Sequence, residues 1–232
     1  MAVPRTRPGN YPAILSYGFR PFFLAGALYA ALSIAVWIPL LHGHLETASL
    51  FAPVDWHVHE LLFGYVAAIV TGFLLTAIPN WTGRLPVQGL PLLALFLLWL
   101  AGRFAVFFSA EIGWLGAFLV DCAFLAAVAA AAAIEIEAGR NRGNLKVLLP
   151  VSVFLAANVV FHIEVRLTGQ SDIGRRLGIA AVMMLVAIIG GRIIPSFTHN
   201  WLVRENPGRL PLPFGRFDAV AIVTSALALG LW

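Results

Sequence analysis

The sequence predicts an all-α polytopic membrane protein, a helical bundle with six full spans and a truncated seventh. Three observations predict this class: 60% of the 232 residues are apolar, only 11% are charged, and the mean hydropathy is +0.89. Soluble domains average roughly 45–50% apolar and about 25% charged residues. A chain of this size could not hide so much apolar surface from water, so we expect the lipid bilayer to be its solvent.

The apolar runs define the predicted spans, because a helix needs roughly 20 apolar residues to cross a bilayer. Six runs are long enough: Phe22–Leu41, His59–Ile78, Leu90–Phe108, Trp114–Ile134, Val147–Leu167 and Leu177–Pro195. A seventh run, Phe217–Trp232, is short for a span. We therefore treat residues 1–232 as a single transmembrane domain and expect it to be the amino-terminal part of a longer protein.

The formal net charge of +4 comes almost wholly from arginine, and the arginines orient the predicted spans. Loops with an excess of Lys and Arg stay in the cytoplasm. A cytoplasmic amino terminus agrees with the tail that carries Arg5 and Arg7 and with the loop that carries Arg140. The loop with Arg175 does not fit this orientation. No basic run with interleaved aromatic residues is present, so we expect no nucleic-acid partner.

The stretch Trp56–Glu60 places two histidines and a carboxylate at the start of an apolar run. Ionisable groups at such a position are costly and usually have a function. If Asp55 caps the helix, His57 and His59 are both helical and point about 200° apart, toward different partners. On an extended lead-in they would share a face. A pair of interfacial histidines bonded to water and lipid headgroups is the alternative to a functional site.

A second histidine motif lies on the fifth predicted span, where Asn158, His162 and Arg166 follow one another at intervals of four residues and form one stripe. A ligating histidine is usually held by a polar group bonded to its second ring nitrogen, which an amide one turn away can supply. The stripe could equally cross-link helices through hydrogen bonds.

The remaining charged residues of the spans fall into two groups. Arg103 and Asp121 are expected at similar depth on neighbouring spans, where opposite charges tend to pair. The alternative is that Arg103 contacts an anionic group such as a haem propionate. Glu60 could serve a proton path or simply be hydrogen-bonded at the interface. Toward the opposite membrane face, Arg192 and His199 lie together near the end of the sixth span.

Four stretches together resemble one protein family. They are SYGFRPFF (Ser16–Phe23), WHVHELLFGY (Trp56–Tyr65), GFLLTAIPNWTG (Gly72–Gly83) and GRIIPSFTHN (Gly191–Asn200). They are similar to the NnrS family of bacterial inner-membrane proteins and spread over most of the chain. The resemblance implies about twelve membrane spans, a content of haem and copper, and a link to nitric oxide metabolism and nitrosative stress.

The resemblance and the residue patterns described above together give a set of candidate site residues. The candidate metal ligands are His57, His59 and His199, from the matching motifs, and His162, added on its spacing. The candidate haem contacts are His57, His59, His162 and Arg103. The candidate supporting or proton-path residues are Glu60, Asn158, Asp121 and Arg192.

The first hypothesis is therefore a haem- and copper-binding membrane protein with nitric oxide as its small ligand; whether it turns over a substrate stays open. Imidazole is a common ligand of haem iron and serves copper well. A transporter or exporter of a small solute, with Arg103, Asp121 and Glu60 lining its path, is the second hypothesis. The third is an assembly factor that delivers haem or copper to a respiratory enzyme.

Overall fold

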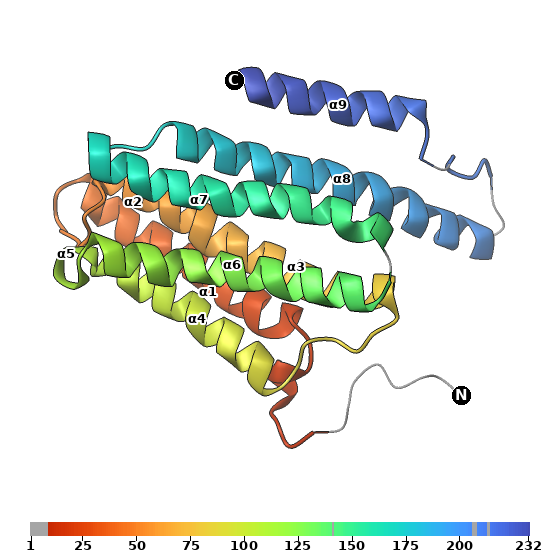
Figure 1. Ribbon diagram of the computed structural model, residues 1–232, viewed down its shortest axis with the longest axis horizontal. Helices are drawn as coiled ribbons and strands as arrows, with labels where there is room; N and C mark the ends of the chain where they lie inside the picture. The colour runs from red at the N-terminus through yellow and green to blue at the C-terminus, as the bar shows by residue number, and fades with distance from the viewer. Residues whose placement is uncertain (1–8, 141, 206–207, 213) are drawn as a thin grey trace.

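The computed structural model describes residues 9–140, 142–205, 208–212 and 214–232. This part of the chain is a bundle of helices and contains no β-strand (Figure 1). Six helical segments are long and apolar enough to cross a membrane: α1 (Phe19–Leu41), Pro53–Thr82, α4 (Leu90–Phe107), α6 (Trp114–Ala138), Gly143–Thr168 and α8 (Ile173–Arg204). The predicted polytopic all-α bundle with six full spans is thus confirmed.

Three short helices accompany the spans. η1 (Ala13–Ser16) precedes α1, α5 (Ser109–Ile112) lies between α4 and α6, and η3 (Arg142–Val147) leads into α7 (Leu148–Thr168). Arg5 and Arg7 of the predicted cytoplasmic tail lie outside the described residues. The cytoplasmic position of the amino terminus stays a prediction.

The second span is one unbroken helical segment. It runs from α2 (Pro53–His59) through a π-helical segment, η2 (Glu60–Val66), into α3 (Ala67–Thr82). The predicted start of this span at His59 was therefore wrong, because the helix begins at Pro53. π-Helical turns are rare and frequently lie at functional sites, and this one begins directly after the second histidine of the motif.

The expected N-cap of this span was also wrong. Ala52 occupies the cap position and Pro53 the first helical position, where the fixed φ of proline suits a helix start. The buried Asp55 carboxylate instead accepts hydrogen bonds from the backbone N–H of Ser171 at 3.1 Å and from its hydroxyl at 2.7 Å. Asp55 therefore ties the start of the second span to the loop that precedes α8.

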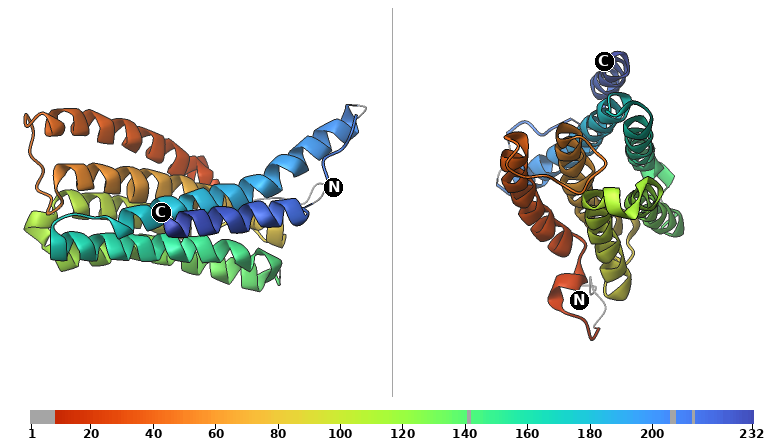
Figure 2. Two further views of the ribbon diagram at one scale, coloured as in Figure 1. Left: turned by 90° about the horizontal axis from the view of Figure 1, so that it is seen from above. Right: turned by 90° about the vertical axis from the view of Figure 1, so that its left-hand side faces the viewer.

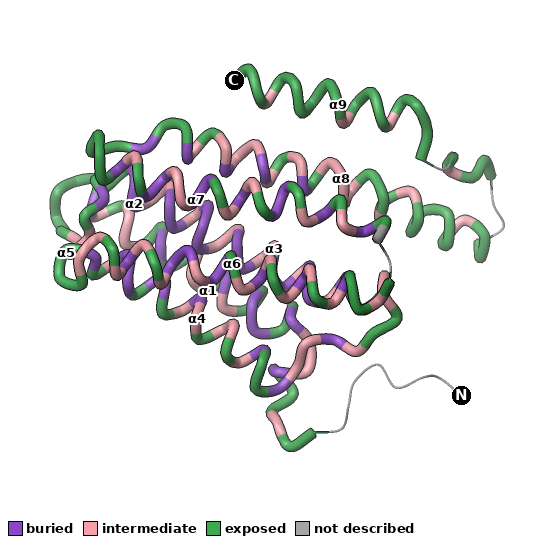
Figure 3. Tube along the Cα trace, in the orientation of Figure 1, coloured by how far each residue is buried: buried purple, intermediate pink, exposed green. Residues whose placement is uncertain are grey.

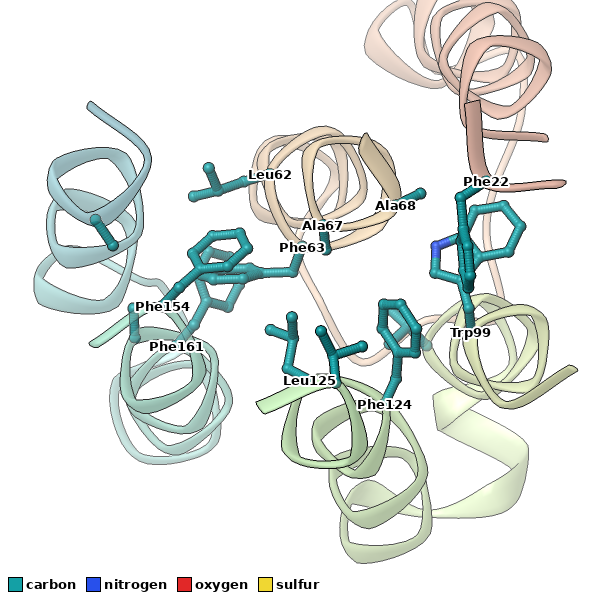
Figure 4. Packing of buried hydrophobic residues seen from close by; sticks show 14 of the residues in the cluster. Phe22, Leu62, Phe63, Ala67, Ala68, Trp99, Phe124, Leu125, Phe154 and Phe161 are labelled. Atoms are coloured by element: carbon teal, nitrogen blue, oxygen red, sulfur yellow. The ribbon is translucent and has the colours of Figure 1, made fainter. Parts of the chain in front are cut away.

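The second span lies at the centre of the bundle. Of its most apolar window, 61% of the residues are buried by other helices, against 17% for α1 and for α8. Figure 4 shows Phe63 against Phe154 and Phe161 of α7 on one side of this span, and Phe124 and Trp99 on the other. Helices in lipid associate through close packing rather than through expulsion of water, and these rings supply much of that contact.

The last full span, α8, is longer than a bilayer requires. Its 32 residues rise about 48 Å at ~1.5 Å per residue, against a hydrocarbon core of about 30 Å. The predicted limits, Leu177–Pro195, were too short at both ends. At its start, Glu164 accepts hydrogen bonds from the backbone N–H groups of Ile173 and Gly174 at 3.0 and 2.7 Å. Its carboxy-terminal part extends beyond the other spans (Figure 1).

The predicted truncated seventh span, Phe217–Trp232, corresponds to α9 (Arg216–Leu231). This helix lies alongside α8 (Figures 1 and 2) and none of its residues is buried. Arg176 donates a hydrogen bond to the carbonyl oxygen of Trp232 at 2.6 Å and so joins the end of α9 to the start of α8. Figure 3 shows the contrast between the exposed α9 and the buried positions of the central spans.

Candidate metal centre

Four polar side chains, each at most 1% exposed, meet inside the bundle. They are His59 at the end of α2, Asp121 on α6, and Asn158 and His162 on α7. Asn158 and His162 point the same way because they are one turn apart. Buried polar groups far from water require partners inside the protein, and these four bond to one another.

Both ring nitrogens of His59 face hydrogen-bond acceptors. Nδ1 lies 3.0 Å from a carboxylate oxygen of Glu60, and Nε2 lies 3.0 Å from Oδ1 of Asn158. Nε2 is also 3.2 Å from Oδ2 of Asp121. A carboxylate on one nitrogen of a histidine is the arrangement that orients metal-ligating imidazoles, because it fixes the proton on that nitrogen and directs the other nitrogen at the metal.

His162 also contacts the Asp121 carboxylate. Its Nε2 lies 3.0 Å from Oδ2 of Asp121, and Asn158 donates from Nδ2 to that oxygen at 2.8 Å. The potential ligand atoms of His59, Asp121 and His162 all lie within 4.8 Å of one another, and no other such group of three occurs in the described part of the chain. Nδ1 of His162 is buried and finds no hydrogen-bond partner among the described residues.

A second layer of charge surrounds these groups. Arg103 on α4 donates to Glu60 at 2.8 Å and also to Asp121, so the expected Arg103–Asp121 ion pair is confirmed. Tyr29 on α1 donates its phenolic hydrogen to Glu60. Gly64 makes room for this contact, because a Cβ there would lie 2.6 Å from Nη1 of Arg103. We call these seven residues the histidine cluster: Tyr29, His59, Glu60, Arg103, Asp121, Asn158 and His162.

The charges of the histidine cluster do not cancel. With both carboxylates ionised, Glu60 and Asp121 carry two negative charges and Arg103 supplies one positive charge. An uncompensated charge in a medium of low dielectric is costly. A proton on an imidazole or a bound metal ion would supply the missing positive charge, so the cluster is electrostatically suited to a cation.

The space around the two imidazoles is filled by aromatic rings. The ring of Phe51 lies 5.1 Å from those of His59 and His162, Phe161 lies 5.1 Å from His59, and Phe118 lies 5.6 Å from His162. This packing fits an ion held between the side chains rather than a planar macrocycle. Arg103, the candidate propionate contact, is paired with two carboxylates of the protein, Glu60 and Asp121.

The structure does not bring the other candidate ligands into the cluster. His57 stacks on Trp37 with ring centroids 4.3 Å apart, so the two histidines of the motif do diverge as a helix requires. Arg192 and His199 lie at the opposite end of the bundle, where both line a cavity beside α9. Arg166, the third member of the stripe on α7, is exposed.

Sequence reasoning missed Tyr29. Its signal was a phenol within an apolar run, since a hydroxyl in a span must find an internal partner. No pattern in the sequence identified that partner, Glu60, which is 31 residues away.

The fold and the cluster together define a multi-pass helical membrane protein with a buried group of histidine and carboxylate side chains that could hold a metal ion. The chain belongs to the NnrS family, because the family model described as "NnrS protein" matches residues 13–232, nearly its whole length. No curated protein and no solved structure matches it.

Proposed function

We propose that this chain binds a copper ion at His59, Asp121 and His162, and that it acts in nitric oxide metabolism or in protection against nitrosative stress in the bacterial inner membrane. The observation that supports it best is the convergence of two imidazoles and a carboxylate, all buried, from three different spans. Imidazole nitrogen suits copper, and the carboxylate would offset part of its charge.

The neighbouring residues have distinct roles under this proposal. Glu60 holds the Nδ1 proton of His59, so that Nε2 is the nitrogen available for the metal. Arg103 keeps Glu60 and Asp121 in position by donating to both. Metal binding displaces protons from ligating groups, and we therefore expect copper affinity to rise with pH.

A bound copper ion would supply a redox-active centre with affinity for small diatomic ligands. The protein contributes a site surrounded by phenylalanine rings, which exclude water. Nitric oxide is small, neutral and soluble in lipid, so it needs no polar channel to reach a site inside the bilayer.

Haem finds no comparable fit at the histidine cluster, because aromatic rings occupy the space around both imidazoles. We assign no described residue to haem, and haem content stays a prediction of the family resemblance. The transporter hypothesis receives less support, because Glu60, Arg103 and Asp121 are buried and bonded to one another instead of lining an open path.

Copper binding by the purified full chain tests the proposal. We expect one copper ion per chain in the wild type, with a rise in the unfolding temperature when copper is added. His162→Ala and His59→Ala should abolish both effects. His57→Ala is the matched control, since it removes a histidine of the same motif that lies outside the group of three.

Two outcomes would contradict the proposal. One is copper binding that survives in His162→Ala, and the other is loss of binding in His57→Ala alone. A change in the copper electron paramagnetic resonance signal on addition of nitric oxide tests separately whether nitric oxide is the small ligand. Haem content is measured on the same preparations and does not depend on these variants.

A further inference from the structure

A cavity of about 770 Å³ lies at the end of the bundle opposite the histidine cluster. It is bordered by the end of α3, by η3, by the middle of α8 and by the start of α9. Much of its wall is aliphatic, with Val147, Ile189 and Val223 among the lining residues. Its volume is within the range of roughly 300–1,000 Å³ that small-molecule sites occupy.

One wall of this cavity presents hydrogen-bond donors and positive charge. Arg192 donates from Nη1 to Oδ1 of Asn144, and its guanidinium lies 5.2 Å from the centroid of the Trp81 ring. These two contacts hold the guanidinium in place at the cavity edge. Lys146, two residues after Asn144, also lines the cavity. We call this cavity the arginine pocket and define it by Trp81, Asn144, Lys146 and Arg192.

Asn144, which borders the arginine pocket, carries an unused donor. The residue is only 2% exposed, and its Nδ2 has no hydrogen-bond partner among the described residues. A buried donor without an acceptor is destabilising, so an acceptor supplied by a ligand would be favoured. Asp218 is the carboxylate of the lining, and it accepts a hydrogen bond from the backbone N–H of Gly215 at 2.8 Å. Arg192 and Lys146 together still outweigh its charge.

The depth of the pocket in the membrane indicates what the ligand is. Trp81 lies at the end of the second span, and tryptophan is enriched at the level of the lipid headgroups. Basic pockets between membrane helices bind anionic headgroups. The aliphatic wall adjoins the donors, so a ligand with an anionic head and an apolar body would meet both surfaces.

We propose that the arginine pocket is a binding site for an anionic phospholipid. Its phosphate is bound by Arg192, Lys146 and the free amide hydrogen of Asn144, and an acyl chain follows the aliphatic wall between α8 and α9. The site is independent of the metal proposed above, because it shares no residue with the histidine cluster.

Lipid binding to the delipidated, purified full chain tests this assignment. Phosphatidylglycerol and phosphatidylcholine are titrated separately, and bound lipid is counted by native mass spectrometry. We expect phosphatidylglycerol to bind more tightly. Arg192→Gln and Lys146→Gln should each weaken it about fivefold, the value for about 1 kcal/mol per cation near a membrane surface.

Arg84→Gln is the matched control, because Arg84 lies at the same end of the bundle and pairs with Glu135 outside the arginine pocket. We expect it to leave lipid binding unchanged. Asn144→Asp keeps the size of the side chain and replaces the free donor with a charge that repels phosphate. It should therefore weaken phosphatidylglycerol binding by a larger factor than phosphatidylcholine binding, because the choline cation offsets part of the repulsion.

Three results would overturn the proposal. The first is equal binding of the two lipids. The second is equal loss of binding in Arg84→Gln and Arg192→Gln, which would indicate a general effect of surface charge. The third is inorganic phosphate bound as tightly as the lipid, because the aliphatic wall would then contribute nothing.

Discussion

The two ends of this bundle solve the problem of charge in a membrane differently. In the histidine cluster, Arg103 is 4% exposed and its charge is matched by two buried carboxylates. At the arginine pocket, Arg192 is exposed and faces a neutral amide and an indole ring. The histidine cluster, the closed end, depends on every partner being present. The arginine pocket, the open end, leaves the Nδ2 donor of Asn144 for a ligand outside the chain.

The difference follows from how the helices pack. Near the histidine cluster, α7 and α8 approach so closely that a Cβ on Gly174 would lie 2.4 Å from the backbone nitrogen of Phe161. Further along α8, a Cβ on Gly191 would meet nothing within 4 Å. Tight packing excludes water and makes each unpaired charge expensive, while loose packing leaves a cavity.

Removing Arg103 should break this comparison most strongly. Arg103→Met leaves Glu60 and Asp121 buried without their common partner, and the loss of one member of a buried ion pair costs about 3–5 kcal/mol. We expect a large fall in the unfolding temperature of the purified protein. An unfolding temperature equal to that of the wild type would show that the cluster is not the closed, charge-coupled unit described above.

Tyr29→Phe removes one hydroxyl from the same cluster and should have the next largest effect. Hydrogen bonds to charged groups contribute about 1.5–3 kcal/mol, and Tyr29 donates to the Glu60 carboxylate. Tyr65→Phe is the control, because Tyr65 is a half-buried tyrosine that lies outside the histidine cluster. Chemical denaturation of both variants measures the difference, and equal stabilities would remove Tyr29 from the cluster.

Gly174→Ala tests the packing argument without touching a charge. The added methyl group meets the backbone of Phe161, and overpacking of this kind costs about 1–3 kcal/mol. Gly191→Ala, on the same helix, meets no atom and should be neutral or stabilising by up to ~1 kcal/mol. If both substitutions changed the unfolding temperature alike, the two halves of α8 would not differ as the comparison requires.

The sequence predicted the spans well, because length and apolarity alone determine whether a helix can cross a bilayer. It failed where a particular contact decides the outcome. Asp55 resembled a helix cap, but its carboxylate is used by Ser171, a residue brought near only by the fold. The end of α8 was placed too early, because a helix that has left the hydrocarbon no longer needs an apolar sequence.

The same limit applies to the candidate site. The sequence brought out His59 and His162, but the choice between His57 and His59 depends on how the second span is rotated in the bundle. That rotation follows from packing such as the stacking of Phe63 on Phe154, 5.1 Å between centroids. Single-sequence periodicity reports which residues share a helix face and does not report which neighbour that face meets.

The smallest expected effect belongs to Arg84, the counterpart of Arg103 at the open end. Arg84 donates to Glu135 at 2.7 Å, a distance similar to the 2.8 Å between Arg103 and Glu60. However, its side chain is 44% exposed, and exposed ion pairs contribute only about 0–1 kcal/mol. Arg84→Met should therefore leave the unfolding temperature almost unchanged. Any small destabilisation that it causes should disappear at high salt, which screens exposed charges. A destabilisation as large as that of Arg103→Met would mean that burial is not what separates the two ends, since the two pairs would then differ in exposure without differing in strength.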